Sequence, residues 1–245
     1  MIPHYYNDIN PIKNHLLAAL PEREFKRMAP RMVETDLIFN TDIYKLNQTI
    51  SDVYFPNSGI ISLLAAVDES STTEVGIVGR EGMVGLPVFL GVHLSRVRAV
   101  VQGTGRAMSM KAADFQAECT RGGAINEILR RFANSMMVQI SQSSVCFRFH
   151  LIEQRLSRWL LMTGDRMETD DFKVTQEFLS NMIGVRREAV NRAARSLQSQ
   201  GLLMNHRGSI EITDRQGLEK AACVCYGVVR EEEDRVLAAS HAKKE

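Results

Sequence analysis

The chain has 245 residues, of which 44% are hydrophobic and 24% are charged, and its formal net charge is +1. This is the composition of a water-soluble globular protein that is long enough for two domains. The small net charge excludes a uniformly basic nucleic-acid coat but allows a local basic patch. The longest apolar run near the middle, residues 60–67, is interrupted by Ser62 and is too short to span a bilayer. Because the first ten residues are polar and aromatic, we expect no signal peptide, no membrane partner and a cytoplasmic location.

The N-terminal half of the chain changes from helical to strand character. Residues 16–37 contain the segment LPEREFKRMAP between Pro21 and Pro30, which predicts one or two short helices. Residues 38–110 contain alternating or β-branched runs separated by Pro-Asn-Ser-Gly and Asp-Glu-Ser-Ser turn clusters. Because no helical pattern separates these runs, they predict an antiparallel roll or barrel.

A proline-free helical pattern follows over residues 121–150. A helix of roughly 27 residues would be about 40 Å long. Its apolar stripe recurs at three- or four-residue steps and consists of Ile125, Leu129, Phe132, Met136, Ile140 and Phe147. The stripe either packs on its own domain or forms the seam of a homodimer. We favour the homodimer, because so long a helix normally extends beyond a small roll.

A second amphipathic helix is predicted over residues 151–162, before the polar segment TGDRMETDD. We therefore place a domain boundary near residues 148–152. This divides the chain into a β-rich unit over 1–120, a long helix over 121–150 and a C-terminal unit over 151–245. The acidic run REEEDR near the C-terminus predicts a solvated helix face.

The C-terminal unit contains two helices joined by a glycine turn. Thr175 is the predicted N-cap of the first helix, and Gly184 can adopt the left-handed conformation that reverses the chain. The second helix is predicted over residues 186–198, with an inner face of Val190, Ala193, Ala194 and Leu197. Two short β runs around His206-Arg207-Gly208 then predict a hairpin. This order is that of a winged helix-turn-helix, whose second helix can enter the major groove of DNA.

The outer face of the second helix is strongly basic. Five arginines and one glutamate give residues 186–207 a local formal charge of +4. Arginine can pair with guanine and asparagine with adenine, while the remaining cations can bind phosphates. The predicted DNA-contacting residues are Thr175, Gln176, Arg186, Arg187, Glu188, Asn191, Arg192, Arg195, His206 and Arg207.

With these motifs, the sequence resembles the Crp/Fnr family of bacterial transcription regulators along essentially its whole length. The segment TQEFLSNMIGVRREAVNR is the most specific part of the resemblance, since the family's Arg-Glu-x-x-x-Arg pattern falls on Arg187, Glu188 and Arg192. Ala189 departs from the family, which often has Thr or Ser there. The resemblance implies a homodimer that inserts two recognition helices into a palindromic operator, with half-sites roughly 34 Å apart. RNA polymerase is a further candidate partner.

The β-rich unit resembles the cyclic-nucleotide-binding domain of the family, but its signature is incomplete. Members that bind cyclic nucleotides carry Gly-Glu and, eleven residues after the glycine, Arg-(Ser/Thr)-Ala. Gly85 and Arg96 keep this spacing, whereas Leu86 replaces the glutamate for the ribose and Val97 replaces the hydroxyl residue at the phosphate. Leucine offers no carboxylate to a ribose. We therefore expect an unknown or absent small-molecule effector other than cAMP at these effector-pocket candidates.

Metal and redox cofactors are not expected from the sequence. The cysteines are Cys119, Cys146, Cys223 and Cys225, and they form neither a CxxC pair nor a zinc spacing with a histidine. Because no cysteine precedes Cys119, we expect no N-terminal iron–sulfur cluster. His93 is the one residue weighed as a haem ligand, and we expect no haem. The cysteines are predicted to be reduced and buried, with core packing or redox sensing as alternatives for Cys223 and Cys225.

The sequence thus predicts an α+β protein with an N-terminal antiparallel β-roll, a long dimerisation helix and a C-terminal winged helix-turn-helix. Its predicted function is dimeric, sequence-specific transcription regulation. The alternative is a small-ligand or cyclic-nucleotide-binding module that acts through protein contacts. No Ser/His/Asp or Cys/His arrangement and no phosphate-binding loop is recognisable, so we do not expect an enzyme.

Overall fold

The computed structural model describes residues 12–66, 72–206 and 208–241. It begins with the short helices α1 (His15–Ala18) and α2 (Glu22–Met28) and a 3₁₀ turn over Ala29–Arg31. The first strand, β1 (Met32–Leu37), starts where we predicted helix, because Pro30 lies in the turn that ends the helical segment.

The N-terminal unit is an antiparallel roll of two sheets, as predicted. One sheet has the strand order β1-β7-β3 and the other β2-β6-β4-β5, and all their pairings are antiparallel. The remaining strands are β2 (Asp42–Tyr44), β3 (Asp52–Pro56), β4 (Ile60–Ala66), β5 (Thr72–Val78), β6 (Arg98–Gly103) and β7 (Gly105–Lys111).

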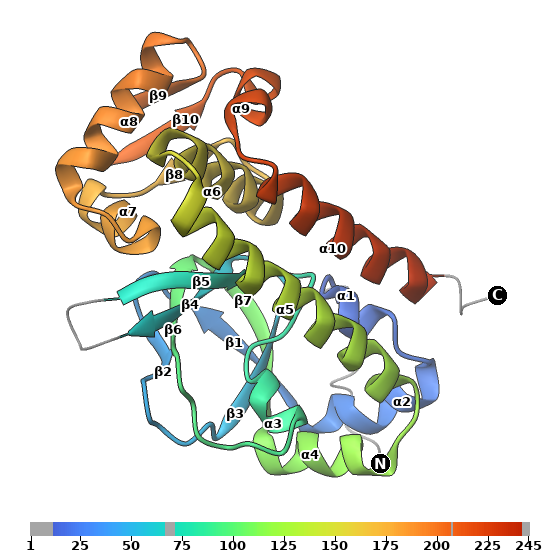
Figure 1. Cartoon of the computed structure of the whole chain (residues 1–245). Coiled ribbons are helices and arrows are strands. Elements are labelled where there is room, and N and C mark those ends of the chain that lie inside the picture. Colours follow the sequence, from blue (N-terminus) through green and yellow to red (C-terminus); the bar gives the residue numbers. More distant parts are fainter. Residues whose placement is uncertain (1–11, 67–71, 207, 242–245) are drawn as a thin grey trace.

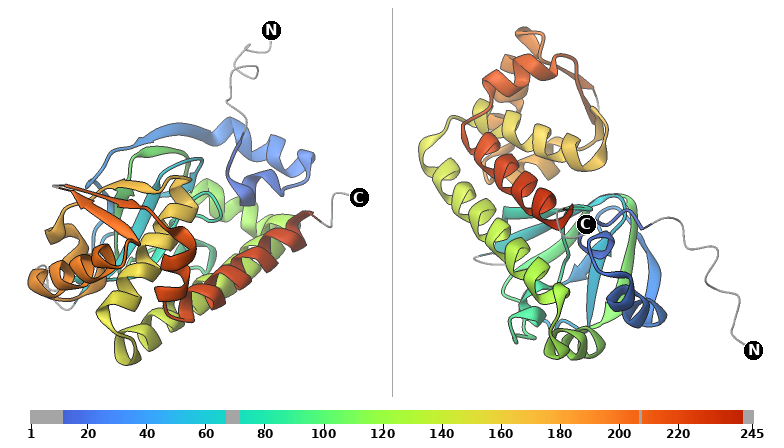
Figure 2. Two further views of the ribbon diagram at one scale, coloured as in Figure 1. Left: turned by 90° about the horizontal axis from the view of Figure 1, so that it is seen from above. Right: turned by 90° about the vertical axis from the view of Figure 1, so that its right-hand side faces the viewer.

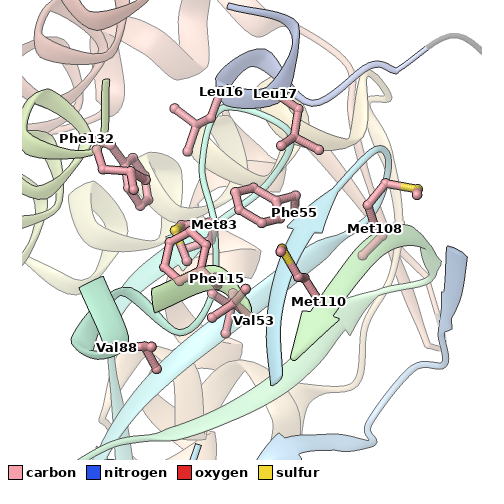
Figure 3. Packing of buried hydrophobic residues seen from close by; sticks show 14 of the residues in the cluster. Leu16, Leu17, Val53, Phe55, Met83, Val88, Met108, Met110, Phe115 and Phe132 are labelled. Atoms are coloured by element: carbon pink, nitrogen blue, oxygen red, sulfur yellow. The ribbon is translucent and has the colours of Figure 1, made fainter. Parts of the chain in front are cut away.

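The core of the roll lies between these sheets and the helices that cover one end. Phe55 of β3 meets Phe115 of α4 (Ala112–Arg121) edge to face, with ring centroids 6.0 Å apart (Figure 3). Val88 of α3 (Leu86–Phe89) and Phe132 of α5 (Ala124–Phe149) join the same buried cluster. Each buried side chain of this size stabilises the fold by about 1.5–3 kcal/mol, so the helices and sheets form one core.

The long helix α5 lies along the roll, and this corrects the predicted dimer seam (Figure 1). Four residues of the predicted seam are only 1% to 5% exposed and belong to the core of the roll: Ile125, Leu129, Phe132 and Met136. Of the other two, Ile140 is 40% exposed, and the half-buried Phe147 ring lies 4.9 Å from the Arg155 guanidinium carbon. The stripe therefore packs mainly on its own domain, which is the interpretation we did not favour.

The C-terminal unit begins after a break at His150, where α5 ends, and its first helix is α6 (Ile152–Met167). The helix-turn-helix pair follows as α7 (Gln176–Ile183) and α8 (Arg187–Ser199). A small antiparallel sheet has the order β8-β10-β9 and consists of β8 (Asp171–Lys173), β9 (Leu203–His206) and β10 (Ser209–Ile212). None of the helices in the described ranges is both long and apolar enough to cross a membrane.

The last two helices are α9 (Arg215–Ala221) and α10 (Cys225–His241), and α10 returns alongside α5 (Figures 1 and 2). Asn134 of α5 donates a hydrogen bond to the Glu232 carboxylate of α10 at 2.6 Å. The chain breaks between α9 and α10 at residues 222–224. This break turns the chain so that α10 can pack on α5.

The roll and the C-terminal unit share a polar and apolar interface. Arg166 of α6 is buried and pairs with Glu81 of the roll at 2.7 Å and with Glu233 of α10. Gln102 of β6 donates to the Thr163 hydroxyl of α6 at 3.0 Å. The prediction of a solvated acidic face is therefore wrong at Glu233, whose partner lies in a helix about 70 residues away.

Candidate DNA-binding surface

The turn between α7 and α8 forms as the sequence predicted. The Thr175 hydroxyl caps α7 by accepting a hydrogen bond from the Phe178 amide at 3.1 Å. Gly184 ends α7 with a left-handed φ of 67°. A Cβ atom at this position would lie 2.7 Å from the Thr73 hydroxyl of β5, so glycine meets both a conformational and a steric requirement.

Helix α8 has a buried back and an exposed front. It begins at Arg187, one residue later than predicted, with Arg186 as its N-cap residue. Its back is completely buried against the rest of the unit and consists of Val190, Ala193, Ala194 and Leu197. The two alanines allow a close approach to α6 and α7, and this packing fixes which side of α8 faces outward.

The front of α8 carries the predicted basic face. The exposed residues are Arg186, Arg187, Glu188, Arg192 and Arg195, while Asn191 is half-buried. Within the described ranges, none of these four arginines forms an ion pair. Helix α7 lies between most of α8 and the roll (Figure 1), but Arg186 at the start of α8 lines a hollow together with Thr72 and Thr73 of the roll. An exposed row of unneutralised guanidinium groups is suited to phosphate and base contacts.

The wing follows α8 as the hairpin of β9 and β10, with His206 paired to Ser209 and with Gly208 at a φ of 87°. Its position is fixed by two hydrogen bonds of Asn205, a residue that we did not single out. The Asn205 amide donates to the Gln198 side chain of α8 at 3.1 Å, and Gln176 of α7 donates to the Asn205 side chain at 3.2 Å.

Of the remaining predicted contacts, Thr175 and His206 are exposed, and Arg207 lies outside the described residues. Gln176 is half-buried, and its amide nitrogen is engaged with the wing. It therefore positions the wing relative to α7. The sequence offered no signal for this contact, because Gln176 and Asn205 meet only once the hairpin folds back.

The effector-pocket candidates are held by contacts within the roll. Gly85 has a φ of 100°, and a Cβ there would lie 2.9 Å from a Val53 methyl group. Leu86 and Val97 pack against the core of the roll, and Arg96 is exposed and donates to the Asn47 side chain at 2.9 Å.

Tyr44 lies between the two ends of this candidate segment. Burial raises the pKa of the Tyr44 phenol to about 12, although interactions of the hydroxyl with Ser95 and with the backbone of Gly85 oppose the shift. The phenol therefore stays neutral, and the Tyr44 side chain occupies the space between Gly85 and Ser95.

A cavity of about 470 Å³ lies instead between the roll and the C-terminal unit. Its lining includes Phe39, Gln102 and Gly103 from the roll and Trp159, Met167 and Phe178 from α6 and α7. The Phe39 and Phe178 rings lie 5.5 Å apart, so the apolar contact between the two units extends to the helix-turn-helix itself.

The four cysteines are buried, as expected. Cys119 lies in α4, whereas the other three meet at the C-terminal end of α5 together with His150. We predicted no zinc spacing between a cysteine and a histidine, but Cys146 and His150 are four residues apart in the sequence and meet here. His93 is exposed on a loop of the roll.

Comparison with known proteins gives a consistent assignment. Residues 154–221 match the Crp-like helix-turn-helix domain. No curated protein matches the chain. A solved structure described as a regulator of the Crp/Fnr family from Eubacterium rectale is similar over 84% of this chain and 96% of its own length, with a TM-score of 0.68 and 18% identity.

Two further solved structures show the same fold. FixK2 from Bradyrhizobium japonicum is similar over 78% of this chain and 98% of its own length, with a TM-score of 0.67 and 15% identity. The c-di-GMP-responsive regulator CLP from Xanthomonas campestris is similar over 78% of this chain and 99% of its own length, with a TM-score of 0.63 and 16% identity. The chain therefore contains a Crp-like helix-turn-helix domain and has, as a whole, the fold of the Crp/Fnr transcription regulators.

Proposed function

We propose that the protein is a dimeric, sequence-specific transcription regulator whose helix α8 enters the major groove of a palindromic operator. The observation that carries this proposal is the exposed arginine face of a helix whose opposite face is completely buried. Arg187, Glu188 and Arg192 would read base edges. Arg186, Asn191 and Arg195 would divide between bases and phosphates, and His206 of the wing and Thr175 at the start of α7 would bind the DNA backbone.

Two copies are required because a palindromic operator presents two identical half-sites. The buried stripe of α5 is not available to a partner, but the same helix exposes other large apolar side chains, namely Met137, Ile140, Val145 and Phe149. We propose that this outward surface of α5 supports dimerisation. The recognition helices would then lie roughly 34 Å apart, one turn of the double helix.

The input of this regulator differs from cAMP. The side chains of Leu86 and Val97 offer no hydrogen-bonding group to a ribose or a phosphate, and Tyr44 lies between the two ends of the segment. A thermal-shift assay with cAMP and with cGMP should show no stabilisation. The alternative, a ligand-binding module that acts through protein contacts, leaves the arginine face of α8 without a role.

Selection of bound sequences from random duplex DNA tests the proposal. We expect a two-fold symmetric site whose half-sites are separated by about one helical turn. On the selected site, affinity should fall steeply with salt concentration, and Arg195→Ala should reduce the salt slope by about 1 if this side chain binds a phosphate. Failure to enrich any sequence, together with weak binding at low salt, would contradict DNA binding.

A further inference from the structure

Four potential ligand side chains meet at the C-terminal end of α5. They are Cys146, His150, Cys223 and Cys225, and their ligand atoms all lie within 4.8 Å of one another. The Cys146 and Cys223 sulfur atoms are 3.4 Å apart, and the Cys225 sulfur lies 3.6 Å from Nδ1 of His150. The three cysteines form a small buried cluster of their own, with exposed fractions between 0% and 4%.

The backbone supplies these side chains as two pairs. Cys146 is in the last turn of α5, and the amide of His150 donates to its carbonyl oxygen at 3.2 Å, so both side chains lie on one side of the helix end. Cys223 and Cys225 flank the break between α9 and α10, where the Tyr226 amide donates to the Cys223 carbonyl oxygen at 3.0 Å. The packing of α10 along α5 brings the two pairs together.

The distances match the coordination sphere of one tetrahedral ion. With Zn–S bonds of about 2.3 Å and Zn–N bonds of about 2.0–2.1 Å, tetrahedral ligands are separated by roughly 3.8 Å between sulfurs and 3.5 Å between sulfur and nitrogen. An iron–sulfur cluster binds its thiolates through different iron atoms, and this spreads them further apart. A disulfide would join only two of the cysteines and would leave the third thiol and the imidazole unexplained.

We propose that Cys146, His150, Cys223 and Cys225 bind a single thiophilic divalent cation, Zn²⁺, in a closed Cys₃His site. Three thiolates and one neutral imidazole are a known donor set for structural zinc, and soft sulfur ligands select against Mg²⁺ and Ca²⁺. On binding, the three thiols release three protons to solvent, and no electron is transferred.

The surroundings suit the charge of the loaded site. Three thiolates and one divalent cation carry a net charge of −1, and buried Arg158 of α6 provides a nearby positive charge. Its Nη2 atom donates to the Ser143 hydroxyl at 3.3 Å, one turn before Cys146 on α5. Cys225 is also the first residue of α10, where the helix dipole favours a negative charge.

The ion would join two parts of the chain that are distant in sequence. It would tie the end of α5 to the start of α10, beside the break at which the chain turns from α5 into α6. The orientation of the helix-turn-helix relative to α5 would then depend on metal occupancy. This consequence for operator binding rests on the proposed function, whereas metal binding itself does not.

Cobalt uptake by the full-length chain tests the site directly. Reduced, metal-free protein should bind about one Co²⁺ per chain and show the thiolate charge-transfer and visible d–d bands of a tetrahedral site, and Zn²⁺ should displace it. The double variant Cys223→Ser/Cys225→Ser should lose this spectrum. Cys119→Ser is the matched control, because Cys119 is also buried but lies in α4, and it should keep both spectrum and stoichiometry.

A second measurement separates metal binding from folding. Zn²⁺ should raise the unfolding temperature of the wild type and of Cys119→Ser but not of His150→Ala, with circular dichroism showing whether each variant is folded. The proposal is overturned if folded wild type takes up neither ion, if the chain isolated without oxygen holds iron and inorganic sulfide at these cysteines, or if Cys119→Ser loses the spectrum as well. Because uptake is measured without DNA, failure of operator binding leaves this result unaffected.

Discussion

At the scale of single residues, the turn of the helix-turn-helix depends on one glycine, Gly184, for both its backbone conformation and its packing. Gly184 adopts a left-handed conformation that is unfavourable for residues with a side chain, and the Thr73 hydroxyl lies only 2.7 Å from where a Cβ would be. Sequence predicted the first requirement, because a glycine follows the apolar face of α7. It did not predict the second, since β5 is more than 100 residues away in the chain.

The substitution Gly184→Ala separates these two requirements when it is compared with Gly201→Ala. Gly201 also has a left-handed φ of 74°, but nothing lies within 4 Å of a Cβ there. We expect Gly201→Ala to lower the free energy of unfolding by about 1–2 kcal/mol and Gly184→Ala to lower it by more. Urea denaturation measures both values, and an equal loss in the two variants would contradict the steric role of Thr73.

A buried carboxyl group gives the stability of the protein a defined pH dependence. Burial raises the pKa of Glu74 to about 7, although Ser62 and Arg158 oppose the shift. Because the folded state binds this proton more tightly than the unfolded state, the contribution of Glu74 to stability is complete below pH 4.5 and is lost as the pH rises through 7.

Replacing Glu74 with glutamine should remove this dependence. We expect Glu74→Gln to raise the free energy of unfolding by about 1–3 kcal/mol at pH 8 and to change it little at pH 4.5. Urea denaturation over this pH range measures the difference, with Glu231→Gln on the exposed surface of α10 as the control. A difference of constant size at all pH values would show that ionisation of Glu74 is not its cause.

At the scale of elements, the sequence predicted the individual helices and strands better than their partners. The apolar period of α5 indicates that one face of the helix is buried but not what covers that face. A homodimer seam and packing on the roll therefore predict the same sequence pattern. In the same way, the alternating pattern of β6 does not show what covers its polar face, where Gln102 meets Thr163 beneath the C-terminal unit. The cysteine cluster escaped prediction because its two pairs are 77 residues apart.

Two substitutions on α5 distinguish its inner and outer faces. Phe132→Ala should lower the free energy of unfolding by about 3–5 kcal/mol, because the ring is only 2% exposed within the roll. Met137→Lys should leave the folded chain intact but shift it from dimer to monomer in sedimentation, because Met137 is 61% exposed. An undisturbed dimer in Met137→Lys would contradict the proposed surface.

At the scale of the whole molecule, the roll, α5, α10 and the helix-turn-helix are joined by contacts that converge around α6. Arg166 pairs with the roll and with α10, and Gln102 bonds to Thr163. Two of the proposed metal ligands, Cys146 and His150, lie just before α6 begins. The C-terminal unit is therefore connected through α6 both to the roll and to α10.

DNA recognition by α8 is tested most directly by the affinity of Arg187→Ala for the selected operator, measured by fluorescence anisotropy at one salt concentration. Its control is Arg23→Ala on α2, an exposed arginine far along the chain from α8. We predict that Arg187→Ala weakens binding by about 5- to 150-fold and relaxes the preference at one base pair of each half-site, while Arg23→Ala binds as the wild type does. If Arg187→Ala binds the operator and its single-base variants as the wild type does, α8 does not read DNA through Arg187.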